Sequence, residues 1–194
     1  EQTLPVSTIM PFSYQVGTTQ VMQLSEAKKQ GTFKPILTLL QQFDPKIEGL
    51  EILVSETSNI PALYLQHADL GLSPIHVFGQ GLQRVLAMAL SLAQVQNGVL
   101  LIDEIEAGIH ISWLSTVFHW LVTACGQNHI QLFATTHSLE AVDAILDTVP
   151  THSIDSDAIV GYRLPNPLPE NSLQRFGGNL LHRLRFERGL DLRG

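Results

Sequence analysis

Large apolar residues recur at every third or fourth position between residues 81 and 96, which predicts a helix. Ala87, Met88 and Leu92 lie between these positions and are also apolar, so the helix is expected to be buried on most of its surface. Asn97-Gly98 is expected to end it. The positions that form the stripe are Leu82, Val85, Leu86, Ala89, Leu90 and Ala93.

Two short apolar runs follow this helix, at residues 99–102 and 130–134. Runs of this length without alternation are typical of strands buried on both faces of a parallel sheet. Ser112 is a candidate cap for a helix between them, and a further helix is expected to reach residue 146. The order helix, strand, helix, strand, helix predicts an α/β fold with a parallel sheet flanked by helices.

The flanking regions are less regular. Residues 1–24 are polar and contain Pro5 and Pro11, which favours a linker or edge segment. Further on, the pattern predicts one helix from Ser25 to Phe43, strands at 47–54 and 62–67, a loop and strand at 69–77, a strand at 158–164, a loop at 165–169 and a helix at 179–188.

Acidic residues follow the first buried strand directly, as Asp103-Glu104. In open parallel sheets, ligands bind beyond the carboxyl ends of the strands. Such a pair could place Mg²⁺ through Asp103 and polarise an attacking water through Glu104. The plainer interpretation is a solvated turn with two exposed acids, and the pair alone favours that one.

Two other features lie at comparable places. His137 follows the second strand, in Thr135-Thr136-His137-Ser138, where an imidazole could contact a terminal phosphate. Gly79 and Gly81 precede the buried helix, and glycines at a helix start let backbone N–H groups approach a phosphate. Taken singly, His137 is better explained as a surface histidine, and the glycines are better explained as a tight turn.

Composition limits the alternatives. The 194 residues suit one domain, and a net charge of −7 argues against nucleic-acid binding over the whole surface. No apolar run is long enough to span a bilayer, and no leader is recognisable. The single Cys125 has no internal disulfide partner, so a cytoplasmic location is expected. Arginines near the end could contact nucleic acid or a partner, although a solvated helix face is favoured.

In combination, these motifs resemble the C-terminal part of ABC-type P-loop ATPases of the AAA-labelled group, which includes OLD-like and SMC-like bacterial ATPases. Residues 100–110, LLIDEIEAGIH, resemble that group's Walker B motif and D-loop. Residues 133–138, FATTHS, resemble its H-switch strand, and residues 79–84, GQGLQR, occupy the place of the ABC signature.

This resemblance implies roles for particular residues. Asp103 would hold Mg²⁺, Glu104 would be the catalytic base and His137 the switch residue. The nucleotide contacts would come from Gly79, Gly81, Gly108, His110 and Ser138. The resemblance also implies a head-to-tail homodimer that encloses ATP and drives an effector or nuclease subunit.

The chain departs from the family pattern at two places. Phe78 stands where the signature normally carries a serine, and Gln80 stands at its second glycine. The P-loop motif G-x-x-x-x-G-K-[ST] does not occur in the sequence. The expected division is therefore a bridge to a missing N-terminal lobe at 1–76, the signature, Walker B and H-switch core at 77–150, and a terminal strand and tail helix of the same domain at 151–194.

Three functions follow from these observations. The first is ATP hydrolysis once a P-loop lobe completes the site. The second is a non-catalytic scaffold that retains the fold, and the third is a metal-dependent nuclease built on Asp103, Glu104, Glu106 and His110. The closeness of these acids in sequence makes the third the least favoured.

Overall fold

The computed structural model describes residues 3–12, 17–54, 60–148, 159–164 and 174–191. Its contacts divide the chain into two compact units, Glu1–Thr135 and Thr136–Gly194. Within the described ranges, every helix is too short or too polar to cross a bilayer.

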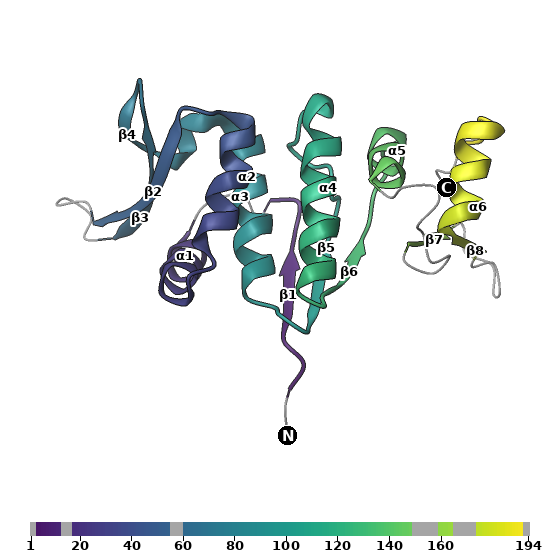
Figure 1. Cartoon of the computed structure of the whole chain (residues 1–194), viewed down its shortest axis with the longest axis horizontal. Coiled ribbons are helices and arrows are strands. Elements are labelled where there is room, and N and C mark those ends of the chain that lie inside the picture. Colours follow the sequence, from purple (N-terminus) through teal and green to yellow (C-terminus); the bar gives the residue numbers. More distant parts are fainter. Residues whose placement is uncertain (1–2, 13–16, 55–59, 149–158, 165–173, 192–194) are drawn as a thin grey trace. The chain divides into compact units, whose positions relative to one another are not determined.

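A parallel sheet of three strands lies at the centre of the first unit (Figure 1). The strands are β1 (Val6–Ile9), β5 (Val99–Ile102) and β6 (Gln131–Ala134), in the order β1-β5-β6. Ile9 pairs with Ile102, and Ile102 pairs with Ala134, so all three strands end at the same edge. The α/β fold with a parallel sheet and flanking helices is confirmed.

Helix α3 (Gly79–Ala93) is the core of this unit. It packs against β1, α1 (Thr18–Gln30), α2 (Phe33–Phe43) and α4 (Ile111–Gln127). Its residues 82–92 are all buried, as the apolar pattern on most sides of the helix predicted. This buried block includes one arginine, Arg84, whose side chain is 0% exposed.

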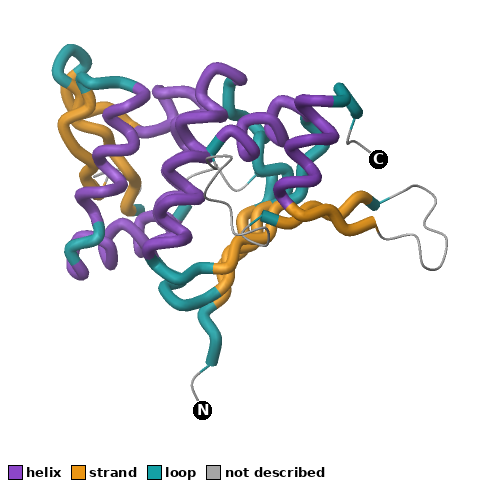
Figure 2. Tube along the Cα trace, turned by 45° about the vertical axis from the view of Figure 1, so that its right-hand side comes forward, coloured by secondary structure: helices purple, strands orange, loops and turns teal. Residues whose placement is uncertain are grey.

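A second, antiparallel sheet is formed by β2 (Ile47–Val54), β3 (Pro61–His67) and β4 (Gly71–Pro74). Leu63, Leu65 and His67 are its buried positions on β3, which contacts α1. Figures 1 and 2 show helices between this sheet and the parallel one. From β4 the chain passes through a 3-10 turn, η1 (Ile75–Phe78), straight into α3.

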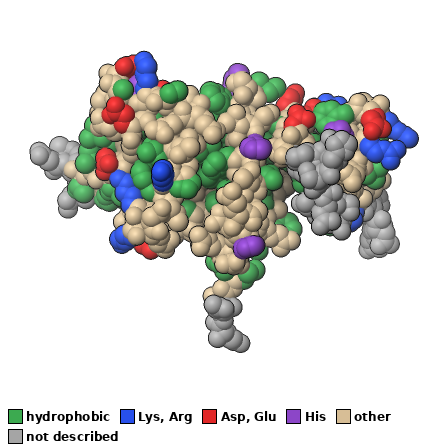
Figure 3. Space-filling view, in the orientation of Figure 1, with side chains coloured by type: hydrophobic (Ala, Val, Ile, Leu, Met, Phe, Trp, Pro, Cys, Tyr) green, Lys and Arg blue, Asp and Glu red, His purple; other side chains and the backbone are tan. Residues whose placement is uncertain are grey.

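Charged side chains of both signs gather over the antiparallel sheet and its neighbouring helix (Figure 3). Lys28 bonds Glu51 at 3.0 Å, and Lys46 pairs with Asp69. Exposed pairs of this kind contribute little to stability, because water screens the charges. This surface therefore balances charge without forming a basic patch of its own.

The structure corrects four expectations for the first unit. Residues 1–24 contain strand β1 and the start of α1, because β1 completes the parallel sheet through tertiary pairing with β5. The helix expected from Ser25 to Phe43 is two helices, broken where Gly31 adopts φ +75°. His110, not Ser112, caps α4. Strand β6 is largely exposed, since it is the edge of the described sheet, and Phe133 is 51% exposed.

The second unit contains α5 (Leu139–Asp147), the hairpin of β7 (Val160–Arg163) and β8 (Gln174–Gly177), α6 (Gly178–His182) and the π-helical turn η2 (Arg183–Glu187). Arg185 forms a bidentate ion pair with Asp143 of α5, at 2.6 and 2.9 Å. Arg183 lies 3.6 Å from Glu187. Two of the tail arginines are thus held in ion pairs, which fits the plainer interpretation of the basic tail.

Two sequence expectations for this unit are adjusted or fall outside the described residues. The tail helix expected at 179–188 is α6 followed by the π-turn, with the α-to-π change at His182–Arg183. The loop expected at 165–169 lies outside the described residues. Gly161 allows β7 to approach α6, because a Cβ there would meet Leu181 Cδ1 at 2.9 Å.

Candidate functional site

The acidic pair lies directly beyond the end of β5, at the carboxyl edge of the parallel sheet. Asp103 is partly exposed, and its amide donates to the Ile9 carbonyl at 2.9 Å, which continues the β1 pairing. Glu104 is exposed and adopts φ +47°, a left-handed conformation that is uncommon for a residue with a Cβ. Strained backbone of this kind, where a ligand is expected, supports a functional hypothesis.

Thr135, at the end of the neighbouring strand β6, bonds both acidic residues. Its Oγ1 donates to Asp103 Oδ1 at 2.5 Å and accepts from the Glu104 amide at 2.9 Å. Its carbonyl accepts from the Ile105 amide at 3.0 Å. One threonine therefore fixes the carboxylate of Asp103 and the backbone of Glu104 together. This role of Thr135 was not predicted from the sequence, although its place at a strand end was a usable signal.

Arg84 of α3 also bonds the segment that contains Asp103 and Glu104. Its Nη2 donates to the carbonyls of Asp103 at 2.9 Å and Glu104 at 3.3 Å, and its Nη1 donates to the Met10 carbonyl. Burial lowers the pKa of Arg84, while the charges of Asp103, Glu104 and Glu106 raise it. Arg84 was not predicted as a site residue, although a charged residue within a largely apolar helix pattern is a signal that could have indicated it.

The glycine-led start of α3 and the predicted D-loop lie against each other. A Cβ on Gly81 would come within 3.0 Å of the Gly108 carbonyl oxygen, so only glycine fits without displacement. Gly79 and Gly108 adopt φ +79° and +75°. His110 Nδ1 accepts from the Ser112 amide at 3.3 Å and caps α4.

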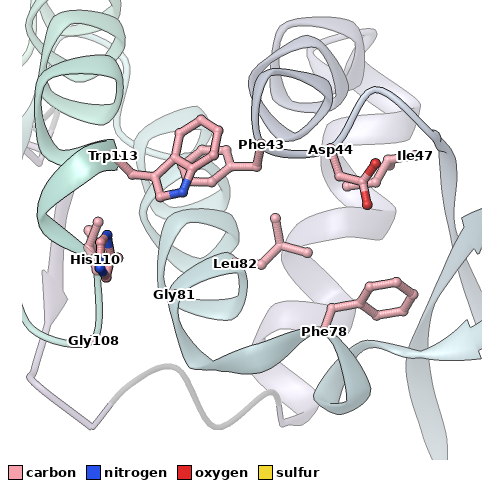
Figure 4. Close-up of a pocket in the computed structure, with 10 residues that line it drawn as sticks. Phe43, Asp44, Ile47, Phe78, Gly81, Leu82, Gly108, His110 and Trp113 are labelled. Atoms are coloured by element: carbon pink, nitrogen blue, oxygen red, sulfur yellow. The ribbon is translucent and has the colours of Figure 1, made fainter.

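A pocket of about 350 Å³ opens beside this contact (Figure 4). The rings of Phe43 and Trp113 stack at its rim, with centroids 4.4 Å apart. Phe78 lies across from them and close to His67, at 5.8 Å between ring centroids. The lining residues are Phe43, Asp44, Ile47, Phe78, Gly81, Leu82, Gly108, Ile109, His110 and Trp113. The aromatic part of this lining was not expected from the sequence.

Asp44 is the acidic group of the pocket. It accepts from the Lys46 amide at 3.0 Å and lies 3.0 Å from His67 Nε2. The Lys46 hydrogen bond and the His67 contact lower the pKa of this carboxyl. Asp44 therefore stays ionised near neutral pH.

The remaining predicted residues, His137 and Ser138, belong to the second unit. Ser138 caps α5, since its Oγ accepts from the Ala141 amide at 3.1 Å. His137 is exposed in the segment immediately before that cap. The structure thus brings Gly81, Gly108 and His110 together in the first unit, with Asp103 and Glu104 tied to α3 through Arg84, and holds His137 and Ser138 at the start of α5.

Among the described residues, no three His, Cys, Asp or Glu side chains form a group that could hold a metal ion. Asp103, Glu104, Glu106 and His110 do not converge as the metal-dependent nuclease would need.

Comparison with known proteins places the sequence motifs in a family. Residues 20–143 match the family described as "AAA domain, putative AbiEii toxin, Type IV TA system". The chain belongs to this family. The match includes the glycine-led helix, the acidic pair and His137, and it supports an ATPase-like P-loop domain of the AAA and SMC-like type.

Two relatives share about a third of their aligned residues with the chain. An uncharacterised protein of Methanocaldococcus jannaschii is 34% identical over 116 residues, which cover 60% of this chain and 99% of that protein. A Helicobacter pylori protein named ATP/GTP phosphatase is 32% identical over 114 residues. That alignment covers 57% of this chain but only 29% of the H. pylori protein, so the chain spans less than a third of that relative.

Solved structures of SMC ATPase heads share the fold. One comes from work on ATP-driven dimerisation and DNA-stimulated activation of SMC ATPases, with TM-score 0.51, 13% identity, and coverage of 87% of this chain and 98% of that one. An Smc head bound to the C-terminal winged-helix domain of ScpA gives TM-score 0.55 at 11% identity, with 88% and 54% covered. A Pyrococcus yayanosii Smc head with its coiled coil gives 0.51 at 12%, with 88% and 33% covered. At these identities the likeness establishes the fold.

Proposed function

We propose that this domain binds and hydrolyses ATP once a P-loop lobe completes its nucleotide site. Glu104 would act as the general base on the attacking water, and His137 would sense the terminal phosphate. The observation that carries the proposal is the pair of hydrogen bonds by which Thr135 fixes Asp103 and Glu104 at the carboxyl edge of the sheet. In a solvated turn without a function, nothing would favour the unfavourable left-handed conformation of Glu104, which Thr135 of the neighbouring strand holds in place.

The residues present suit a magnesium ion. Mg²⁺ prefers oxygen ligands, and the Asp103 carboxylate and Thr135 hydroxyl lie together at the strand ends. Asp103 would hold the ion, which neutralises phosphate charge when it is bound with ATP. Glu104, one residue further along, is exposed and can reach a water molecule beside it.

The P-loop lobe would extend the parallel sheet at the exposed edge of β6. Among the described strands β6 pairs only with β5, and an open edge presents backbone groups that a further strand can bond. A strand added there would deliver a phosphate-binding loop next to Thr135 and Asp103. This lobe would precede residues 1–76, which then bridge to the core at 77–150 and the tail at 151–194.

The proposed active form is a head-to-tail homodimer in the cytoplasm. Gly79, Gly81, Gly108 and His110 would meet the nucleotide held by the partner copy, and Ser138 would support His137. The contact between Gly81 and the D-loop supports one shared surface for these residues. ATP binding would close the dimer and hydrolysis would reopen it, which would drive an effector, such as a nuclease or a nucleic-acid-binding subunit.

Calorimetry with ATP and Mg²⁺ tests the proposal, on the 194-residue chain and on the chain supplied with a P-loop lobe. We expect ATP binding and turnover only when the P-loop lobe is present. Glu104→Gln should keep binding but lower turnover by at least about 100-fold. Absence of binding in both samples would favour the alternative, a non-catalytic scaffold that retains this fold.

A further inference from the structure

Arg84 is a buried cation whose hydrogen bonds within the described residues go to backbone carbonyl oxygens. It lies in the second turn of α3, and its side chain is fully buried. Its guanidinium donates to three backbone carbonyls, those of Met10, Asp103 and Glu104. Its Nε is also buried and has no hydrogen-bond partner within the described part of the chain.

Such burial is unfavourable for stability alone. Taking a charge out of water costs several kcal/mol, and apolar residues of similar volume often replace buried ions without loss of stability. Here desolvation opposes the charged form and is the largest influence on the pKa of Arg84. Arginine nevertheless remains protonated in proteins, so a permanent positive charge lies beneath the acidic segment.

The bonds of Arg84 act on the backbone that aims the acidic pair. Glu104 is held at both ends, because its amide donates to Thr135 Oγ1 and its carbonyl accepts from Arg84. Its φ of +47° keeps it in a conformation that a free chain rarely adopts. Two side chains from different elements, α3 and the end of β6, therefore fix the direction in which the Glu104 carboxylate leaves the backbone.

Arg84 also links two parts of the proposed site. Gly81 lies in the first turn of the same helix, three residues before Arg84, and is close to the Gly108 carbonyl. A helix is stiff over one turn, so a displacement of its glycine end would reach the carbonyls of Asp103 and Glu104 through the guanidinium.

We propose that Arg84 is a positioning residue for ATP hydrolysis, which orients the Asp103-Glu104 backbone and couples it to the glycine-led start of α3. This inference rests on the proposed function. It assigns Arg84 no contact with ATP, and its effect passes through the two acidic residues.

The test uses the hydrolysing protein, with its P-loop lobe, and two substitutions. Arg84→Met keeps the length and removes the charge, while Arg84→Lys keeps the charge but replaces the planar fork by one ammonium nitrogen. We expect both to lower kcat by about 100-fold, the effect of misplacing a reacting group by about 1 Å. We expect the affinity for ATP to change less than about threefold, because the proposed phosphate contacts lie elsewhere.

Two readouts separate positioning from a structural role. The Mg²⁺ concentration for half-maximal turnover should rise in both variants, because Asp103 is displaced, whereas partial unfolding would lower only the active fraction. Ser91→Ala removes a buried polar group from the same helix and should leave kcat and the Mg²⁺ requirement unchanged. Folded Arg84 variants with kcat and Mg²⁺ requirement within about twofold of the native protein would overturn the inference.

Native turnover distinguishes the two proposals. If the native protein hydrolyses ATP and the Arg84 variants match it, the proposed function stands and the inference fails. If the native protein does not hydrolyse ATP, both fail. Should neither variant fold, hydrogen exchange of the native protein decides: ATP with Mg²⁺ must slow exchange across both 82–90 and 103–105, and slowing confined to one segment contradicts the coupling.

Discussion

Thr135 donates its hydroxyl hydrogen to Asp103 Oδ1 at 2.5 Å and, through the same oxygen, accepts from the amide of Glu104. Thirty-two positions separate Thr135 from Asp103, and parallel pairing of β5 with β6 brings them together. The bond joins the residue expected to hold Mg²⁺ to the strand that leads toward His137. It therefore links two motifs that the sequence presents separately.

Removing this hydroxyl should impair hydrolysis more than folding. Hydrogen bonds to charged groups contribute about 1.5–3 kcal/mol, so Thr135→Val should lower turnover by at least about tenfold. Thr135→Ser keeps the hydroxyl and should retain most activity, and Thr123→Val, at an exposed site on α4, should change nothing. Steady-state assays of ATP turnover, on the protein supplied with its P-loop lobe, measure these effects. Equal turnover in the valine and serine variants would show that the Thr135 hydroxyl has no role in hydrolysis.

Glu104 is expected to lower the free energy of unfolding of the protein while it enables ATP hydrolysis. A left-handed conformation costs about 1–2 kcal/mol for most residues and less for asparagine. Glu104→Asn should therefore raise the free energy of unfolding by about 1 kcal/mol while it abolishes turnover. Glu104→Gln should abolish turnover without that gain. Denaturant titration of both variants decides, and identical midpoints would show that φ +47° is not strained here.

Gly81 and Gly126 form a matched pair for the crowding between α3 and the D-loop. A Cβ on Gly81 would meet the Gly108 carbonyl at 3.0 Å, whereas one on Gly126 of α4 meets nothing within 4 Å. Alanine should stabilise the helix at position 126 by about 0.5–1 kcal/mol. At position 81 the clash should offset that gain, leaving a difference of about 1–2 kcal/mol between the variants. Equal denaturation midpoints would mean that the D-loop moves away from a side chain at position 81 at no cost in stability.

Cys125 should react slowly in the folded protein. Burial raises the pKa of its thiol to about 11, so the thiolate is scarce at pH 8. Alkylation by iodoacetamide should accelerate by about 100-fold or more on unfolding, and the single cysteine makes the mass shift unambiguous. Because the folded pKa is raised, the stability from this thiol is complete below pH 9.0 and is lost as pH rises through about 11. Rapid alkylation of native protein at pH 8 would contradict the burial.

Asp44 should make the fold sensitive to acid. Its pKa lies below 3.8 because the Lys46 amide and His67 favour the carboxylate, so the stability it provides is present above pH 3.8 and lost as pH falls further. Asp44→Asn should reduce the loss of stability between pH 6 and pH 3, measured by urea titration. Asp69→Asn, which removes an exposed partner of Lys46, should keep that loss. Parallel curves for Asp44→Asn and the native protein would refute the assignment.

Local pattern was a reliable guide where one segment specified its own structure. The apolar density of residues 82–92 predicted the buried helix, and the short apolar run at 99–102 predicted a strand that ends in Asp103-Glu104. Motif order also led to the family, which the match over residues 20–143 confirmed. The roles of the individual site residues stay predictions.

Strand β1 and the cap of α4 could not be predicted from local pattern. Val6–Ile9 looks like linker because its neighbours are polar, and it becomes a strand only because β5 supplies its hydrogen bonds. His110 displaced Ser112 as the cap of α4 through its ring nitrogen, a choice that depends on the backbone of the D-loop. The strand was missed because a partner far along the chain overrode local propensity, whereas the cap was decided by a bond between residues two positions apart.

By itself, the sequence determined the α/β class, the strand that ends in the acidic pair and the family, because apolar periodicity and motif spacing are local properties. Only the tertiary structure decided that Thr135 and Arg84 hold Asp103 and Glu104, and that Gly81 meets Gly108. Hydrogen bonds and close contacts between distant segments depend on strand register and helix packing. These follow from burial of the whole core and cannot be read from any single stretch of chain.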